Sequence, residues 1–142
     1  MLLKGIARPA PRKLAGKLKR RKAVNEWYRR ELQGVPEIEI PFKEFSHSPS
    51  YHVFPILLSD SIDRGLFMEK LKGKRIQTSI HYPPIHRFSY YKSLAGRRDT
   101  ELKWTDYVGD HEVTLPLYPG LSRENVQYIA RSIRSALQEL GY

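Results

Sequence analysis

The 142-residue sequence contains no cysteine. Disulfide bonds, thiolate nucleophiles and cysteine-ligated zinc are therefore excluded. It also has no run of about 18 consecutive apolar residues, so it predicts no membrane-spanning helix. Both absences fit a protein of a reducing compartment, and we expect the cytoplasm.

Acidic and hydroxyl-bearing side chains are scarce at the amino terminus. Residues 1–34 hold eleven of the 25 basic residues and two of the 15 acidic ones, which gives them a formal charge of +9, whereas residues 35–142 carry only +1. No serine or threonine precedes Ser46. The shortage of hydroxyl groups argues against a transit peptide, and no apolar core of a secretory signal is present.

The stretch "KRRKAVNEWYRR" interleaves basic and aromatic side chains, as a surface that binds phosphates and stacks bases would. Trp27 is the best candidate for such stacking, whereas Tyr28 falls on an apolar stripe and is expected in the core. A charge run on a helix is more often a solvated face. A basic nucleic-acid-binding module therefore stays an alternative function, and a nucleic-acid partner is disfavoured.

Proline and apolar periodicity divide the chain into three segments. Residues 1–12 contain Gly5, Pro9 and Pro11 and are expected to form an irregular head. Residues 13–34 form a basic connecting helix, ended by Gly34 and Pro36. Its apolar side chains recur at three- to four-residue steps: Leu14, Leu18, Val24, Tyr28 and Leu32. Residues 35–142 form a single small domain.

The first half of this domain alternates strand and helix signals. Strands are expected at 37–40 and at 51–58, where Pro55 indicates an edge position or a bulge. A helix over 62–72 should be capped by Asp60 or Ser61 and ended by Gly73. The stretch "RIQTSIHY" at 75–82 predicts another strand. Strand, helix and strand in this order indicate one βαβ unit.

The second half is harder to read up to residue 111. Its aromatic side chains predict local packing, and "AGRRDTE" predicts an exposed loop before a short helix. A last strand or extended segment follows at 112–120. Ser122 should cap a final helix that carries the clearest apolar stripe, made of Val126, Ile129, Ile133, Leu137 and Leu140. The fold class is α+β, a small sheet covered on one face by helices.

The stretch "SIHYPPIH" places His81 and His86 on either side of two prolines. A metal site, an acid–base pair and the lip of a pocket would all fit these residues. The prolines prevent a shared helical face and no zinc-site spacing is present, so no metal site is expected. No Gly-x-Ser-x-Gly elbow or phosphate-binding loop occurs either. The sequence therefore predicts no catalytic residue and no self-contained active site.

The order of several motifs resembles the carboxyl-terminal portion of the DegT/DnrJ/StrS family of sugar aminotransferases. These motifs are "YHVFPILL", Arg64 with "LFMEKLK", "IQTSIHYPPIH", "YYK", "TE" and "VTLPLYPGLS", followed by an amphipathic helix. The upstream "RRKAVNEWYRRELQGVPEIEIP" is similar to the long connecting helix of that family and the strand after it. The resemblance covers residues 13–140.

The resemblance implies a small domain of a type I pyridoxal-phosphate enzyme, usually a homodimer, that moves an amino group from glutamate to a nucleotide-linked keto sugar. In such enzymes a separate large domain supplies the cofactor lysine and most phosphate contacts. None of the lysines here stands in the family's cofactor segment. We therefore expect a domain that is inactive alone, binds no cofactor by itself, and needs a large domain or self-association. Half of a split enzyme is an alternative.

Within the resemblance, "HYPPIH" corresponds to a lip of the active-site cleft. It implies that His81, Tyr82 and His86 contact substrate without carrying out chemistry. The sequence departs from the family just before the strand at 75–82, where Arg75 replaces a glycine and Gly73 lies two residues earlier. We expect the helix cap to move by two residues, to Gly73.

Overall fold

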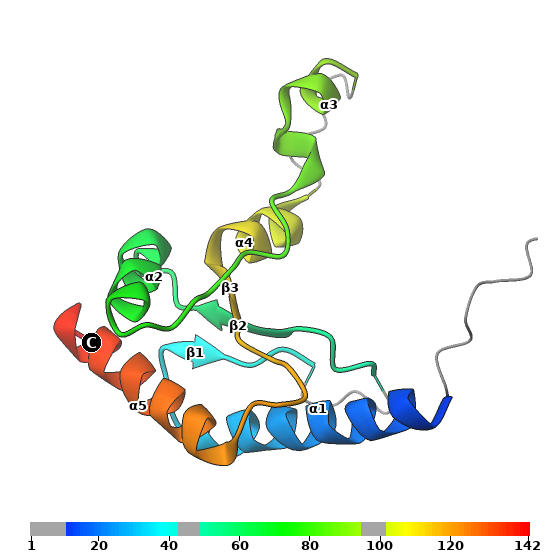
Figure 1. Ribbon diagram of the computed structural model, residues 1–142. Helices are drawn as coiled ribbons and strands as arrows, with labels where there is room; N and C mark the ends of the chain where they lie inside the picture. Colours follow the sequence, from blue (N-terminus) through cyan, green and yellow to red (C-terminus); the bar gives the residue numbers. More distant parts are fainter. Residues whose placement is uncertain (1–10, 43–48, 95–101) are drawn as a thin grey trace, which may run out of the picture.

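The computed structural model describes residues 11–42, 49–94 and 102–142 (Figure 1). The first ten residues of the expected irregular head and the whole "AGRRDTE" segment lie outside the described residues. Within them, no helix is both long enough and apolar enough to cross a membrane.

The connecting helix α1 spans Pro11–Glu31. It begins two residues earlier than expected, at a proline, because the first turn of a helix does not use its amide donors. Val24, Tyr28 and Leu32 of the predicted stripe are buried, but Leu14 is 60% exposed. The amino-terminal turns of α1 extend beyond the end of helix α5, so α5 does not cover them (Figure 1).

Three antiparallel strands form one sheet in the order β1 (Ile38–Glu39), β2 (Phe54–Leu58) and β3 (Glu112–Leu115). Phe54 is opposite Leu115, and Ile56 is opposite Val113. Because side chains alternate between the faces of a strand, these four residues share one face. That face lies in the apolar core.

Pro55 lies in the central strand, so the expected edge position is wrong. Its partner Thr114 uses its own amide and carbonyl toward Ser79 (2.8 and 3.2 Å). In an antiparallel sheet the amide and the carbonyl of one residue point toward the same neighbouring strand. Because those of Thr114 point toward Ser79, they form no hydrogen bond with Pro55 on the other side. The missing donor of Pro55 therefore faces the side of β1. On that side β1 pairs only with Leu57 and Leu58. Pro55 therefore needs no amide proton for a hydrogen bond to β1.

The strand expected at 75–82 is also wrong. Only one bridge forms in this segment, between Ser79 and Thr114, and it is antiparallel. Since β2 and the Ser79 segment are both antiparallel to β3, they run parallel to each other. The expected βαβ unit is therefore present in a split form, with β3 between its two extended segments.

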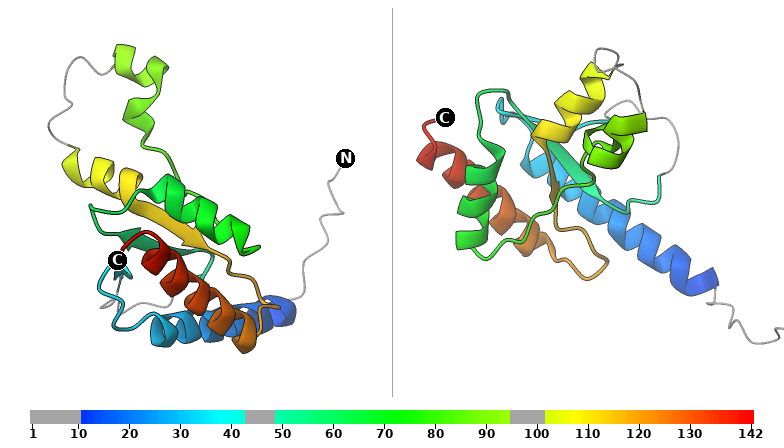
Figure 2. Two further views of the ribbon diagram at one scale, coloured as in Figure 1. Left: turned by 90° about the vertical axis from the view of Figure 1, so that its left-hand side faces the viewer. Right: turned by 90° about the horizontal axis from the view of Figure 1, so that it is seen from above.

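Helices α1, α2 (Arg64–Gly73) and α5 (Arg123–Glu139) contribute to the core below the apolar face of the sheet (Figures 1 and 2). The predicted role of Tyr28 in the core is confirmed. Its ring stacks on Phe54 at 4.7 Å, and its hydroxyl donates to the Pro116 carbonyl at 2.9 Å. Burial and the neighbouring Tyr118 raise the pKa of Tyr28. Trp27 is partly buried against the same core.

A second layer projects from the opposite side of the sheet. It consists of the 3₁₀ helix η1 (Ile85–Arg87) and the helices α3 (Ser89–Leu94) and α4 (Lys103–His111) (Figure 1). The aromatic residues expected to pack here contact one another, as Tyr90 does with Tyr91 and Trp104 with Tyr107. They do not enter the core, and Trp104 is 81% exposed.

The caps of α5 agree with the sequence. The Ser122 hydroxyl accepts from the Asn125 amide at 3.2 Å, and Gly141 follows the last turn with φ of 94°. All residues of the predicted stripe are buried except Leu140, which is partly buried. Glu139 joins α5 to α2 through Lys74 (2.7 Å) and Lys70 (3.2 Å). These two lysines lower the pKa of Glu139 to about 2.

The caps of α2 differ from the expectation at both ends. Asp63, and neither Asp60 nor Ser61, caps the amino terminus by accepting from the Leu66 amide at 2.9 Å. At the other end the cap does not move to Gly73. Arg75 takes the left-handed conformation, with φ of 59°.

Arg75 occupies the position where a Schellman motif usually has glycine. The Ile76 amide donates to the Leu71 carbonyl, and the Arg75 amide donates to the Lys72 carbonyl, both at 2.9 Å. The motif is thus complete although its residue carries a Cβ that disfavours the left-handed conformation. Hydrogen bonding and the burial of Ile76 hold the turn.

We expect Arg75→Gly to raise the free energy of unfolding by about 0.5–1 kcal/mol, because glycine adopts positive φ without the steric cost. Urea denaturation measures the change. Lys72→Gly is the matched control, since it also removes an exposed cation but lies inside the helix, and it should destabilise by a similar amount. A loss of stability in Arg75→Gly would contradict the assigned turn.

Candidate functional site

The face of the sheet opposite the core is polar at β3. Glu112 and Thr114 point to this face because they alternate with Val113 and Leu115, and both are buried. The Glu112 carboxylate accepts from the backbone amide of His81 at 2.9 Å and from the hydroxyl of Thr114. The buried carboxylate thereby has a hydrogen-bond donor on each oxygen, as a buried charge requires.

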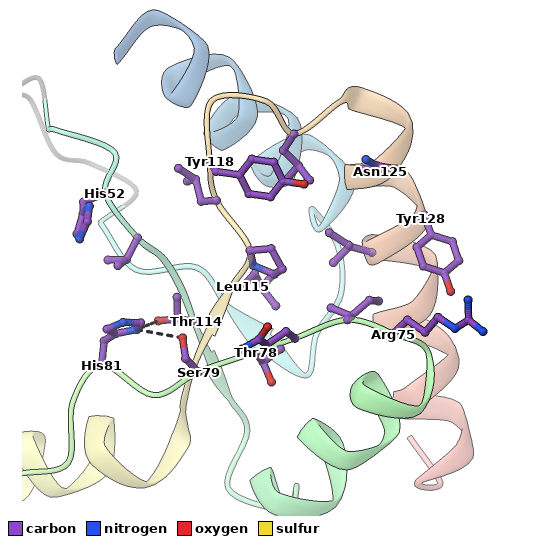
Figure 3. Close-up of a pocket in the computed structure, with 17 residues that line it drawn as sticks. His52, Arg75, Thr78, Ser79, His81, Thr114, Leu115, Tyr118, Asn125 and Tyr128 are labelled. Atoms are coloured by element: carbon purple, nitrogen blue, oxygen red, sulfur yellow. Dashed lines mark hydrogen bonds between the residues drawn. The ribbon is translucent and has the colours of Figure 1, made fainter. Parts of the chain in front are cut away.

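His81 is held against this polar face (Figure 3). Its Nδ1 lies 3.0 Å from the Thr114 hydroxyl and 3.4 Å from the Ser79 hydroxyl. The ring also lines a hollow of about 690 Å³ between the Ser79 segment, β3 and α5. The polar side chains Arg75, Tyr118, Asn125 and Tyr128 line the opposite part of the hollow (Figure 3).

Tyr82 and His86 do not line this hollow. Tyr82 is 77% exposed, and its ring meets that of His81 edge-on at 4.9 Å. His86 is directed toward α4, where its Nε2 lies 2.8 Å from Asp106 Oδ1. The structure therefore brings two of the three candidate residues together and places the third on a separate cluster.

The cluster around His86 is an ion-pair network between η1 and α4. Arg87 Nε donates to Asp106 Oδ1 at 2.6 Å, and Arg87 Nη2 donates to Asp110 Oδ2 at 2.8 Å. The hydrogen bond from Arg87 lowers the pKa of Asp110. For Asp106, desolvation raises the pKa, but hydrogen bonds from Arg87 and His86 outweigh it and the pKa is lowered. The network fixes the position of η1 on α4.

The double proline is seated on the same helix. Pro84 is buried and begins η1, and a Cβ on Gly109 of α4 would lie 2.3 Å from Pro84 Cγ. Arg64 closes the end of α4 by donating to the carbonyls of Gly109 (2.5 Å) and Glu112 (3.3 Å). The stretch "HYPPIH" is thus a supported lip beside the hollow.

Sequence reasoning missed Glu112, Thr114 and the partners of His86. A signal existed in "EVTL", where the strand period places Glu112 and Thr114 on one face. Another existed in α4, where Asp106 and Asp110 are four residues apart and so share a helical face. Neither pattern identifies the partner of the two aspartates, because Arg87 lies 19 residues before Asp106 in the chain.

The residues of the hollow do not fit pyridoxal phosphate. No lysine lines it, and Arg75 is its one cation opposite His81. The described residues also contain no group of three or more histidine and carboxylate side chains able to hold a metal ion. The hollow offers hydroxyl, amide, phenol and imidazole groups, which can bind a polar organic molecule without reacting with it.

Comparison with solved structures defines the class of fold. Helicobacter pylori PseC, an aminotransferase of pseudoaminic acid biosynthesis, superposes with a TM-score of 0.82 at 24% identity, over 91% of this chain and 35% of the other. Streptomyces venezuelae DesV, in complex with a ketimine intermediate, superposes with a TM-score of 0.78 at 24% identity, over 88% and 33%. The α+β fold is the one found in part of these sugar aminotransferases.

Sequence comparison shows the family. The sequence model of the DegT/DnrJ/EryC1/StrS aminotransferase family matches residues 9–134, and the chain belongs to this family. A dTDP-4-amino-4,6-dideoxy-D-glucose transaminase of Escherichia coli is 30% identical over 83% of this chain and 33% of its own length. A UDP-4-amino-4,6-dideoxy-N-acetyl-beta-L-altrosamine transaminase of Campylobacter jejuni is 26% identical over 92% and 35%. The chain spans about a third of the length of these relatives.

We expect Gly109→Ala to lower the free energy of unfolding by about 1–3 kcal/mol, because the new methyl group would overlap the ring of Pro84. Chemical denaturation measures the loss, and amide chemical shifts of residues 82–88 should move with it. Gly16→Ala is the control, since nothing lies within 4 Å of its added Cβ, and it should stabilise α1 slightly. Unchanged stability of Gly109→Ala would show that the lip is not seated on α4.

Proposed function

We propose that residues 35–142 act as the small carboxyl-terminal domain of a pyridoxal-phosphate-dependent nucleotide-sugar aminotransferase, and that residues 13–34 are its connecting helix. The observation that carries this proposal is the family match together with a hollow that has polar lining and no lysine. A domain of this kind contacts the sugar, while a large domain holds the cofactor and its lysine. The pair would move an amino group between an amino acid, glutamate in the family, and a nucleotide-linked keto sugar.

The substrate-side contacts in this proposal are His81, Tyr82 and His86. His81 fits such a role because it lines the hollow and is held by buried partners. Tyr82 presents an exposed ring and hydroxyl next to it. His86 is held by Asp106 at the base of η1 and would contact substrate only from the outer side of the lip.

The exposed apolar surface of the lip and of α4 also supports a large domain as the partner. Large apolar side chains are exposed along the lip and on α4, among them Tyr82, Ile85, Phe88 and Trp104. Exposed apolar side chains in one region mark a surface that is covered in the working protein. A large domain of the same or a separate chain would cover them, with homodimer formation as in the family. The split-enzyme alternative differs only in where the large domain is encoded.

The purified 142-residue chain should leave the absorbance of added pyridoxal phosphate unchanged and should show no transaminase activity. Co-expression with a large-domain polypeptide encoded in the same genome should yield a complex that binds the cofactor and transaminates. Borohydride reduction followed by mass spectrometry distinguishes attachment of pyridoxal phosphate at one lysine from its non-specific reaction with many exposed lysines. Stoichiometric attachment at one lysine of this chain, or turnover by the chain alone, would sink the proposal.

In the assembled enzyme, His81→Ala should lower kcat/KM for the sugar substrate by about 10- to 100-fold, because a hydrogen bond to substrate is lost. Cofactor absorbance should not change, since the lysine and phosphate contacts lie on the large domain. The exposed Lys72→Ala serves as the control and should keep full activity. Wild-type kinetics for His81→Ala would remove this residue from the substrate site.

A further inference from the structure

Glu112, Thr114 and His81 form a chain of hydrogen bonds on the polar face of the sheet. Glu112 is 3% exposed and Thr114 is 6% exposed, whereas His81 lies at the edge of the hollow. One carboxylate oxygen accepts from the His81 backbone amide at 2.9 Å, and the other accepts from the Thr114 hydroxyl. The same hydroxyl lies 3.0 Å from His81 Nδ1. The chain thus connects a buried carboxylate to one nitrogen of the imidazole.

The protons in this chain can be ordered in two ways. A carboxylate only accepts hydrogen bonds, so an ionised Glu112 requires the single Thr114 proton to point toward it. Thr114 Oγ1 can then only accept from the imidazole, so its 3.0 Å contact with His81 Nδ1 is a hydrogen bond only when Nδ1 carries the proton. The Ser79 hydroxyl, at the longer distance of 3.4 Å, then accepts from the same nitrogen. The reverse order would need a protonated Glu112. We adopt the first order, in which the His81 amide and the Thr114 hydroxyl each donate to one oxygen of the Glu112 carboxylate.

The order of the protons determines whether the second ring nitrogen of His81, Nε2, donates a hydrogen bond to a ligand or accepts one from it. A neutral imidazole with its proton on Nδ1 carries a lone pair on Nε2. Both hydrogen bonds of the His81 ring to described residues are made by Nδ1, which leaves Nε2 for a ligand. Because hydrogen bonds of one nitrogen set the protonation of the other, a change at Thr114 would alter the chemistry at the opposite edge of the ring.

We propose that Glu112 and Thr114 are positioning residues that fix neutral His81 with its proton on Nδ1, so that Nε2 accepts a hydrogen bond from a hydroxyl or ammonium group of the substrate. Such a site favours donor groups and disfavours carbonyl or phosphate oxygens, which would face a lone pair. The identity of the ligand as an amino or keto sugar rests on the proposed function. The tautomer of His81 rests only on its hydrogen bonds within this chain.

Nitrogen-15 NMR of the 142-residue chain, with its histidine rings neutral, reads the tautomer directly. His111 is an internal reference for a protonated Nδ1, since this nitrogen lies 2.7 Å from the Tyr107 carbonyl and must donate to it. Its Nε2 lies 3.5 Å from Asp60 Oδ1 and is not a reference for a bare nitrogen. His52 lines the same hollow without a hydrogen bond to a described residue and reports an unconstrained ring. His81 should match His111 in carrying a proton on Nδ1, and its own Nε2 should carry none. A proton on Nε2 of His81 would overturn the proposal.

Two variants at one position separate positioning from simple packing. Thr114→Val keeps the shape of the side chain but removes the hydroxyl, and it should turn His81 into a mixture of tautomers like that of His52. Thr114→Ser restores the hydroxyl and should restore the pattern of the unchanged chain. If Thr114→Val folds with an unaltered His81 tautomer, Thr114 has no positioning role. If it does not fold, the measurement on the unchanged chain still decides.

In the assembled enzyme, Thr114→Val should raise KM for the sugar about tenfold with a smaller effect on kcat, and Thr114→Ser should reverse this change. An unchanged KM in a variant whose tautomer has shifted would overturn the substrate contact at Nε2. Absence of any transaminase activity in the unchanged complex would instead refute the proposed function, and the NMR result on His81 would be unaffected.

Discussion

The alternation of side chains along β3 is the constraint on which the rest of this structure depends. Val113 and Leu115 are buried with the core of α1, α2 and α5, and the strand period then forces Glu112 and Thr114 to the opposite face. A buried carboxylate on that face must have donors, and the amide of His81 supplies one. The packing of the core therefore fixes the position of the lip, because the four residues of β3 contact the core on one face and hold His81 on the other.

Helix α5 and its caps could be predicted well because their signals are local. A Ser122 cap, an apolar stripe and a terminal glycine are all contained within α5. The family and the α+β class followed from motifs that are short and ordered along the chain. The start of α1 at Pro11 and the cap of α2 at Asp63 shifted by only two or three residues, as helix ends often do.

Long-range contacts explain what could not be predicted. The segment 75–82 has strand-like composition, yet the ladder partner available to it is a single residue, Thr114, so only one bridge forms. Pro55 fits a central strand because Thr114 directs its backbone groups to Ser79 on the other side, 35 residues away from Thr114 in the chain. The left-handed Arg75 depends on hydrogen bonds and on the burial of Ile76, and composition reports neither. In the candidate site, His81, Tyr82 and His86 were visible as a motif, but their buried or charged partners were not.

The division of the molecule into two layers has a consequence for how the lip can work. Core packing ends at the sheet. Arg64 of α2 holds the end of α4 there, and η1 is seated on α4 through Pro84 and Gly109. Ion pairs of Arg87 with Asp106 and Asp110 then stiffen this outer layer internally. A layer built in this way can keep its own shape while its exposed aromatic side chains adapt to a partner surface. His81 is the exception, because its hydrogen bonds tie it to the sheet and not to the outer layer. A ligand in the hollow would therefore meet one imidazole set by the rigid core and a set of contacts carried by the projecting lip.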